Sequence, residues 1–261
     1  MGCRPMTLLS VQELSKRFGG LQAIDRVSFS VPQGAIKALI GPNGAGKTTL
    51  FNLISGVLEQ DSGYITFDGK PVHGLRPHQI AAKGIVRTFQ HIRLFPNMTA
   101  LENVMIGRHI HSRAGFVSGM LSLPFTRKEE KAIARKGREV MDFLGIADIA
   151  DADATSLAYG QQRIVELGRA LACEPRLLLL DEPAAGLNMR ETAEMAALIG
   201  RIRKLGITVF LVEHDMSLVM NISDEVMVLS YGQKIAEDCP LAIQKNSEVI
   251  KVYLGEDDAS N

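Results

Sequence analysis

The 261-residue sequence predicts an α/β fold built on a mainly parallel sheet. Apolar runs that read as buried strands alternate with helical patterns along the chain, which is typical of such a fold. The strand at 35–40 leads into a glycine-rich loop, and the strands at 177–180 and 207–212 end in charged residues. Because parallel α/β sheets bind ligands at the carboxyl ends of their strands, we expect these polar segments to form one site.

The glycine-rich loop fits the phosphate-binding pattern G-x-x-x-x-G-K-[ST], and a helical pattern follows it. Glycines let several backbone N–H groups converge on one anion. Lys47 is expected to reach the β- and γ-phosphates, and the Thr48 hydroxyl to bind Mg²⁺. The alternative is an incidental glycine-rich turn, which the flanking strand and helix disfavour. The residues predicted to hold the nucleotide are Gly41, Pro42, Asn43, Gly44, Ala45, Gly46, Lys47, Thr48 and Thr49.

Two adjacent acids follow a run of leucines at 177–180. A purely structural buried strand would rarely place two carboxylates at this point. Asp181 is expected to hold Mg²⁺ together with Thr48, through water, and Glu182 to polarise the attacking water. His214, after the next buried strand, is expected to orient that water or the γ-phosphate. These features alone predict a Mg²⁺-dependent NTPase with a parallel sheet.

The segments around this site carry less specific patterns. Residues 7–34 read as short strands, and Phe18 beside a glycine turn reads, taken alone, as a core residue rather than a ligand contact. The strand at 85–90 ends in Gln90, which by itself fits a strand cap. The apolar positions of a helix near 195–205 are Met195, Leu198, Ile199, Ile202 and Leu205.

The region 91–156 has a different character. Thr99 and Glu102 form a capping-box pattern that predicts a helix start. Residues 109–126 read as an irregular insertion, and 127–144 as a helix with one apolar face and a solvated charged face. His109 and His111 suggest a metal site, but no third ligand is suitably spaced, so surface histidines are favoured.

Composition excludes several classes of protein. Lys and Arg total 29, as do Asp and Glu, which argues against a nucleic-acid partner held by bulk charge. The 3 cysteines lie far apart with no C-x-x-C, as expected in a reducing compartment. No apolar run approaches the roughly 18 residues needed to cross a bilayer. The first residues lack a signal-peptide core and a myristoylation motif, so a cytoplasmic location is expected.

Taken in order, the motifs resemble those of ATP-binding-cassette (ABC) ATPases along nearly the whole chain. The resemblance rests on the phosphate loop, Gln90, the segment 157–161 (the signature), the strand 177–182 and His214. It implies a P-loop NTPase (RecA-like) fold with an N-terminal antiparallel β subdomain and an inserted helical subdomain. The implied divisions are a core at 7–90 and 157–238, a helical subdomain at 91–156 and a polar tail at 256–261 within one domain ending at 255.

The resemblance also assigns roles. It implies that Phe18 stacks on adenine, reversing the first interpretation, and that Gln90 contacts Mg²⁺ and water and senses a membrane partner. Lys47, Gln90, Glu182 and His214 become the catalytic set, and Thr48, Gln90 and Asp181 the Mg²⁺ ligands. The signature would contact ATP bound to an opposite cassette, and its residues are Leu157, Ala158, Tyr159, Gly160 and Gln161.

Closer variants resemble the LivG-type ATP-binding subunits of branched-chain amino-acid importers. They lie at 87–90, 157–163, 182–188 and 252–255. This likeness implies a head-to-tail pair of cassettes with ATP between them, two membrane permease subunits and a periplasmic binding protein. The chain would then sit at the cytoplasmic face of the membrane, with residues 91–106 docking the permease.

Two departures from the cassette pattern affect this interpretation. Ala158 replaces the usual signature serine, and Asn188 replaces the usual aspartate after the Mg²⁺-site strand. Loss of the serine hydroxyl would weaken the opposite γ-phosphate site by roughly 1.5–3 kcal/mol. We therefore hypothesise an unequal heterodimer. The alternatives are a soluble cassette acting on DNA or ribosomes and a small-molecule P-loop kinase. No coiled-coil insertion or basic arm favours the former, and the latter would not require the signature.

Overall fold

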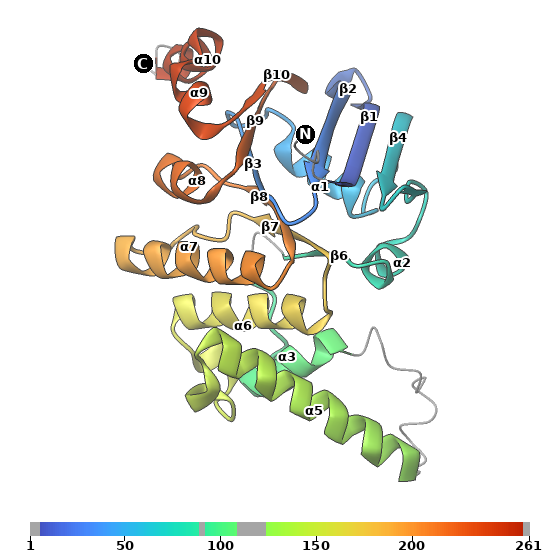
Figure 1. The fold of residues 1–261 in the computed structure, drawn as a ribbon, viewed down its shortest axis with the longest axis vertical. Coiled ribbons are helices and arrows are strands. Elements are labelled where there is room, and N and C mark those ends of the chain that lie inside the picture. Colours follow the sequence, from blue (N-terminus) through green and yellow to red (C-terminus); the bar gives the residue numbers. More distant parts are fainter. Residues whose placement is uncertain (1–5, 89–91, 109–123, 258–261) are drawn as a thin grey trace, which may run out of the picture. The chain divides into compact units, whose positions relative to one another are not determined.

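The computed structural model describes residues 6–88, 92–108 and 124–257. The chain divides into two compact units (Figure 1). The first comprises Met1–Ile80 and Arg176–Asn261, and the second Ala81–Pro175. The second unit extends beyond the segment 91–156 in both directions.

The first unit contains an antiparallel sheet with the order β2-β1-β4-β5. Its strands are β1 (Thr7–Phe18), β2 (Leu21–Pro32), β4 (Ser62–Phe67) and β5 (Lys70–Pro71). β1 and β2 each span 12 residues, so the prediction of short strands was wrong. Register shifts between Val11 and Leu14, and between Leu14 and Lys16, interrupt the alternation that marks a strand in sequence.

The second sheet of this unit runs β10-β9-β3-β8-β7 and confirms the predicted mixed α/β class with a mainly parallel sheet. β9, β3, β8 and β7 are parallel neighbours, and β10 is antiparallel to β9. Every residue of β3, β7 and β8 is buried, which explains why these strands are apolar except at Lys37, Asp181 and Thr208. The strands are β3 (Ile36–Ile40), β7 (Leu177–Asp181), β8 (Thr208–Val212), β9 (Glu225–Ser230) and β10 (Gln233–Asp238).

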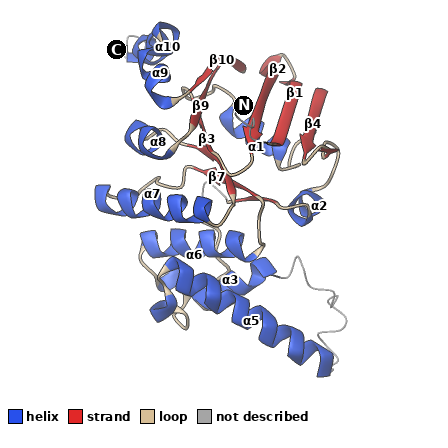
Figure 2. Ribbon diagram, viewed as in Figure 1, coloured by secondary structure: helices blue, strands red, loops and turns tan. Residues whose placement is uncertain are grey.

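Helices follow these strands along the chain (Figure 2). They are α1 (Lys47–Ile54), α2 (Pro77–Ala82), α7 (Met189–Lys204), α8 (Met216–Ile222), α9 (Pro240–Lys245) and α10 (Ser247–Asp257). The predicted apolar face of α7 is buried except for Leu205, which follows the last helical residue and is 60% exposed. α10 continues to Asp257 and so includes the first two residues of the predicted polar tail. Asn246 Oδ1 caps this helix by accepting from Glu248 N–H at 2.9 Å.

The second unit is mainly helical. Its elements are β6 (Ile85–Arg87), α3 (Ala100–Arg108), α5 (Pro124–Leu144), α6 (Tyr159–Ala172) and the 3₁₀ turns Ala147–Ile149 and Ala154–Ser156. The three α-helices contact one another. Gly107 permits a close approach, since a Cβ there would lie 1.9 Å from the Arg169 carbonyl oxygen. The predicted capping box is confirmed by bonds of 2.7 and 3.1 Å between Thr99 and Glu102.

The charged helix of this unit begins three residues earlier than predicted, at Pro124 rather than 127. Proline is favoured in the first turn of a helix, which accounts for the difference. Its predicted apolar face is confirmed, because Ile133, Val140, Met141 and Leu144 are all buried. His109 and His111, the two residues of the metal-site alternative, lie outside the described residues.

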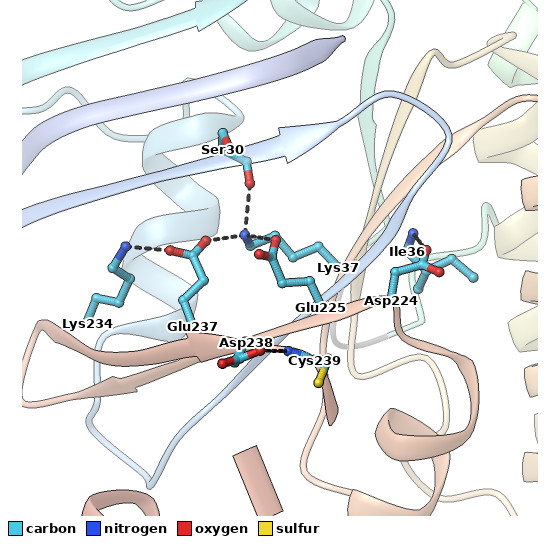
Figure 3. Close-up of polar contacts among 9 residues, drawn as sticks. All are labelled: Ser30, Ile36, Lys37, Asp224, Glu225, Lys234, Glu237, Asp238 and Cys239. Atoms are coloured by element: carbon cyan, nitrogen blue, oxygen red, sulfur yellow. Dashed lines mark hydrogen bonds and ion pairs between the residues drawn. The ribbon is translucent and has the colours of Figure 1, made fainter. Parts of the chain in front are cut away.

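A buried lysine ties the two sheets of the first unit together (Figure 3). Lys37 of β3 is 0% exposed, and its Nζ donates to the Ser30 carbonyl of β2 at 2.8 Å. The same Nζ pairs with Glu225 of β9 at 2.6 Å and with Glu237 of β10. Burial acts to raise the pKa of Glu237, but hydrogen bonds from Lys234 and Lys37 outweigh it, and the pKa lies below its usual range. This cluster fixes the start of the strand that leads to the phosphate loop.

Candidate functional site

The phosphate loop connects β3 to α1, as predicted. Gly41, Gly44 and Gly46 have positive φ angles of 150°, 78° and 102°. A Cβ at Gly41 would lie 2.1 Å from the Leu229 carbonyl oxygen, and one at Gly46 would lie 2.5 Å from that of Ala23. Both positions therefore require glycine, because both the backbone conformation and the space exclude a side chain.

Lys47 starts α1, and its Nζ donates to the carbonyl oxygens of Gly41 and Pro42 at 2.5 and 2.8 Å. The ammonium group thus lies against the loop that precedes it. Thr48 and Thr49 follow in the first turn of α1, where helices bind anions through their N–H groups. Asn43 and Thr48 are exposed. The loop combines a cation, a helix N-terminus and glycine backbone, which together suit a polyphosphate.

The adjacent acids lie at the carboxyl end of β7. Asp181 is 2% exposed and is in register with Val212 of the parallel neighbour β8. Glu182 N–H donates to the Val212 carbonyl at 2.9 Å, so the chain stays attached to β8 beyond the strand end. Glu182 has a φ of +49°, an unfavourable conformation for a residue with a Cβ. Such strain in proteins is concentrated at functional sites.

His214 follows the end of β8, and its side chain is 68% exposed. It is preceded by Glu213, a buried acid with no predicted role. Oε1 of Glu213 accepts from Ala184 N–H at 2.8 Å, and Oε2 accepts from His214 N–H at 3.1 Å. Burial raises the pKa of Glu213, although these backbone bonds oppose the increase. An acid directly after an apolar strand of buried residues is the signal that could have revealed it.

The parallel sheet therefore brings together several of the predicted site residues. The phosphate loop follows β3, Asp181 and Glu182 end β7, and His214 follows β8, which lies between those two strands. All of them belong to the first unit. Gln90 lies outside the described residues.

Phe18 ends β1, at the hairpin that leads into β2, and is 45% exposed. The interpretation of Phe18 as a core residue was therefore wrong. Its ring lies 5.7 Å from Lys16 Nζ, a cation–π distance. An exposed aromatic ring leaves a face for another planar group, which is compatible with the implied adenine contact.

The signature begins α6 in the second unit. Ala158 occupies the N-cap position, and its N–H donates to Gln161 Oε1 at 3.2 Å. Only this half of a capping box is made, because alanine has no side-chain acceptor. Tyr159 is 47% exposed, and its hydroxyl accepts from the Arg163 guanidinium at 3.1 Å. Leu157 precedes the N-cap, and Gly160 is the second residue of α6.

Asn188, the second departure from the cassette pattern, is the N-cap of α7. Its Oδ1 accepts from the N–H groups of Arg190 and Glu191, each at 3.0 Å. Glu191 completes a capping box by accepting from Asn188 N–H at 2.9 Å. Asparagine thus supplies the capping acceptor that an aspartate would supply here.

Comparison with known families identifies the chain. Residues 24–185 match the family model described as ABC transporter. The chain belongs to the ABC transporter family. A further model, described as branched-chain amino acid ATP-binding cassette transporter, matches residues 233–259, a segment that includes β10, α9 and α10.

Relatives of this cassette match along almost their full length. The high-affinity branched-chain amino acid transport ATP-binding protein BraF of Pseudomonas aeruginosa is 44% identical over 250 residues, which are 95% of this chain and 98% of BraF. The protein of the same description named LivG in Escherichia coli K12 is 43% identical with the same coverage. These relatives confirm the sequence-based family assignment.

Solved cassettes have the same fold. A nucleotide-free ATP-binding cassette from an ABC transporter is 32% identical and aligns with a TM-score of 0.84, covering 95% of this chain and 99% of its own. The ADP conformation of another ABC-transporter cassette aligns with a TM-score of 0.84 at 33% identity, covering 96% and 99%. They confirm the P-loop fold of this cassette.

Two structural observations concern the membrane and metals. Over residues 6–88, 92–108 and 124–257, the cassette has no helix with the length and hydropathy needed to cross a bilayer. Over the same ranges, no group of 3 or more His, Cys, Asp or Glu side chains is placed to hold a metal ion.

Proposed function

We propose that this chain is the ATP-binding, ATP-hydrolysing subunit of an importer for branched-chain amino acids. The observation that carries the proposal is the placement of the phosphate loop, Glu182 and His214 at the ends of neighbouring strands of one sheet. The solute is inferred from BraF and LivG, whose names specify branched-chain amino acid transport. Their alignments cover 95% of this chain. A soluble cassette acting on nucleic acid or ribosomes is not favoured by these relatives.

The residues of the loop suit ATP. At Gly41 and Gly46 a Cβ would clash with backbone oxygens at 2.1 and 2.5 Å, so the loop conformation depends on glycine at both positions. Lys47 Nζ donates to loop carbonyls, and we expect it to exchange these for phosphate oxygens of higher negative charge. Phe18 would stack on the adenine ring, and the signature residues would contact the ATP of an opposite cassette.

Thr48 and Asp181 would hold Mg²⁺, with Gln90 as a further contact. A hydroxyl and a carboxylate are oxygen ligands of the kind that Mg²⁺ prefers, with substrate phosphates completing the set. The described residues include no group of three or more His, Cys, Asp or Glu side chains placed to hold a metal ion. A Mg²⁺ site here would therefore use the phosphates of the nucleotide as further ligands. Mg²⁺ would supply neutralisation of charge on the phosphate oxygens.

The remaining residues would move and orient the water. Glu182 would accept the proton of the attacking water as general base, and His214 would orient that water or the γ-phosphate. Lys47 would stabilise charge that develops on the phosphate. Gln90 would sense the membrane partner.

The partners follow from the same proposal. A second cassette, of a different chain, would supply a serine-containing signature to the site formed by Lys47, Glu182 and His214. The opposite site, which would use Ala158, would turn over more slowly. Two permease subunits would dock on residues 91–106 at the cytoplasmic face of the membrane and receive solute from a periplasmic binding protein.

The rate of ATP hydrolysis with Mg²⁺ tests the proposal. It is measured for the purified chain alone and for the chain together with the second cassette that co-purifies from membranes. Glu182→Gln should abolish turnover and trap an ATP-bound dimer, measured by light scattering. Glu194→Gln is the matched control, because Glu194 lies on the surface of α7 at 60% side-chain exposure and pairs with Arg190. Turnover that survives Glu182→Gln would refute the assignment of the base. Uptake of leucine by vesicles containing the complete assembly tests the solute.

A further inference from the structure

Glu213 forms a polar node at the carboxyl end of β8. The residue is 1% exposed, and its side chain is 0% exposed. One carboxylate oxygen accepts from Ala184 N–H at 2.8 Å. The other accepts from His214 N–H at 3.1 Å and, at 3.5 Å, from Asp215 N–H. A single side chain thus bonds both the segment after Glu182 and the segment that contains His214.

The backbone around this residue extends the node to the phosphate loop. Glu213 N–H donates to the Leu39 carbonyl at 3.4 Å, two residues before Gly41. The preceding residue, Val212, accepts from Glu182 N–H at 2.9 Å. The peptide units at 212–213 therefore contact the strand that leads to the phosphate loop and the start of the turn that follows β7.

The segments that Glu213 joins have local hydrogen bonds of their own. In the turn after β7, Ala185 N–H donates to the Glu182 carbonyl at 3.1 Å. At α8, Asp215 supplies the N-cap by accepting from Leu218 N–H at 3.1 Å. Each turn therefore has a hydrogen bond that does not involve Glu213. The bonds from Glu213 act between these turns.

The chemistry of the side chain suits this bridging task. A buried carboxylate is costly unless hydrogen bonds compensate for its lost hydration. Glutamate offers two acceptor oxygens, so each oxygen can serve a different segment. Glutamine would offer one acceptor and would turn an N–H donor toward the second backbone N–H. Apolar residues would leave both N–H groups without this acceptor.

We propose that Glu213 is a positioning residue for ATP hydrolysis, which fixes the turn after Glu182 relative to the backbone of His214. The inference rests on the proposed function, since it assumes that these two residues act on the same water and phosphate. Misplacement of a catalytic group by about 1 Å can lower a rate by about 100-fold. Glu213 would therefore affect turnover without contacting ATP.

The test compares Glu213→Asp, Glu213→Gln and Glu213→Ala in the assembled importer purified from membranes. We expect kcat to fall by about 10- to 100-fold in the Gln and Ala variants, with KM for ATP within about threefold of wild type. Glu213→Asp keeps two acceptor oxygens and should retain more turnover than Glu213→Gln. A loss confined to KM, or a kcat within twofold of wild type in Glu213→Ala, would overturn the proposal.

Asp224→Asn serves as the matched control for lost structure. Asp224 Oδ2 also accepts a backbone N–H in this unit, from Ile36 at 2.8 Å, but at the opposite, amino end of β3. We expect this variant to lower the melting temperature while kcat and KM stay within about twofold of wild type. If Glu213→Ala and Asp224→Asn both lose kcat in proportion to the fall in their melting temperatures, the role of Glu213 is structural and the proposal fails.

A second measurement does not depend on hydrolysis. Hydrogen exchange of the Ala184 and His214 amides should be at least about tenfold faster in Glu213→Ala, because both lose their acceptor. Unchanged exchange would refute the bridging role whatever the activity. If exchange increases but wild-type protein hydrolyses no ATP, the proposed function fails while the bridge stands. If the effects of Glu213→Ala and His214→Ala on kcat were additive in the double variant, this would also contradict the proposal, because the effects of residues that act together are non-additive.

Discussion

The amide N–H of Gly232 donates to the carbonyl oxygen of Ala45 at 3.0 Å, which attaches the turn between β9 and β10 to the phosphate loop. The Gly232 carbonyl accepts from Asp25 N–H of β2 at 2.9 Å. A Cβ on Gly232 would lie 2.7 Å from the Ala23 carbonyl oxygen, so this contact also depends on glycine. The phosphate loop is therefore held by both sheets of the first unit.

Gly41→Ala should disrupt this loop. The added Cβ would lie 2.1 Å from the Leu229 carbonyl oxygen, a backbone atom that cannot move without displacing β9. We expect ATP affinity to fall by at least about 100-fold, measured by calorimetric titration. Gly69→Ala is the control, because Gly69 also has a positive φ, +69°, but open space around it. Equal affinities of the two variants would contradict the steric argument.

Ala158→Ser should stabilise the cassette. Ala158 is the N-cap of α6 at φ −57° and ψ 150°, and its side chain makes no capping bond. A serine hydroxyl there would accept a backbone N–H of the first turn and stabilise the chain by about 1 kcal/mol. The melting temperature should rise by about 2–4 °C in calorimetry. Ala158→Gly offers no such acceptor, so an equal rise in that variant would argue against capping.

The sheet and its strand ends could be predicted because burial imposes a simple pattern. Leu177–Asp181 and Thr208–Val212 are buried on both faces, so no charged residue precedes Asp181 in the first strand or Glu213, which follows the second, and these acids mark the strand ends. The bulges of β1 break the alternation that a half-buried strand would show, which hid its length. The role of Glu213 could not be predicted from the sequence, because its side chain bonds to Ala184, 29 residues away in the chain.

Asn188 allows a test of whether the departure from aspartate matters for folding. Asn188→Asp should leave the free energy of unfolding unchanged or raise it by a few tenths of a kcal/mol, because a charged acceptor also interacts with the helix dipole. Asn188→Ala should lower it by about 1 kcal/mol, because the N–H groups of Arg190 and Glu191 lose their acceptor. Chemical denaturation of the three proteins measures both effects. Equal stability of all three would show that the cap contributes nothing.

Lys37→Met should reveal how strongly the buried cluster stabilises the fold. Lys37 is 0% exposed and pairs with Glu225 and Glu237, so methionine would leave both acids without their shared cation. We expect the free energy of unfolding near neutral pH to fall by about 2–4 kcal/mol. This is less than the loss expected on breaking a fully buried ion pair, because the two acids are partly exposed. Lys234→Met is the control. Lys234 is 30% exposed in its side chain and contacts only Glu237 within the cluster, so a smaller loss is expected.

The pH dependence follows from the lowered pKa of Glu237. A carboxyl whose folded-state pKa lies below its unfolded value stabilises the native state above the unfolded pKa, about 4.3 for glutamate. That contribution is lost as the pH falls through the folded-state pKa, when the carboxylate is protonated. The stability difference between wild type and Lys37→Met should therefore shrink as the pH is lowered below about 4. Urea titrations at several pH values measure it, and a difference that grew in acid would rule out the ionised Glu237–Lys37 pair as its source.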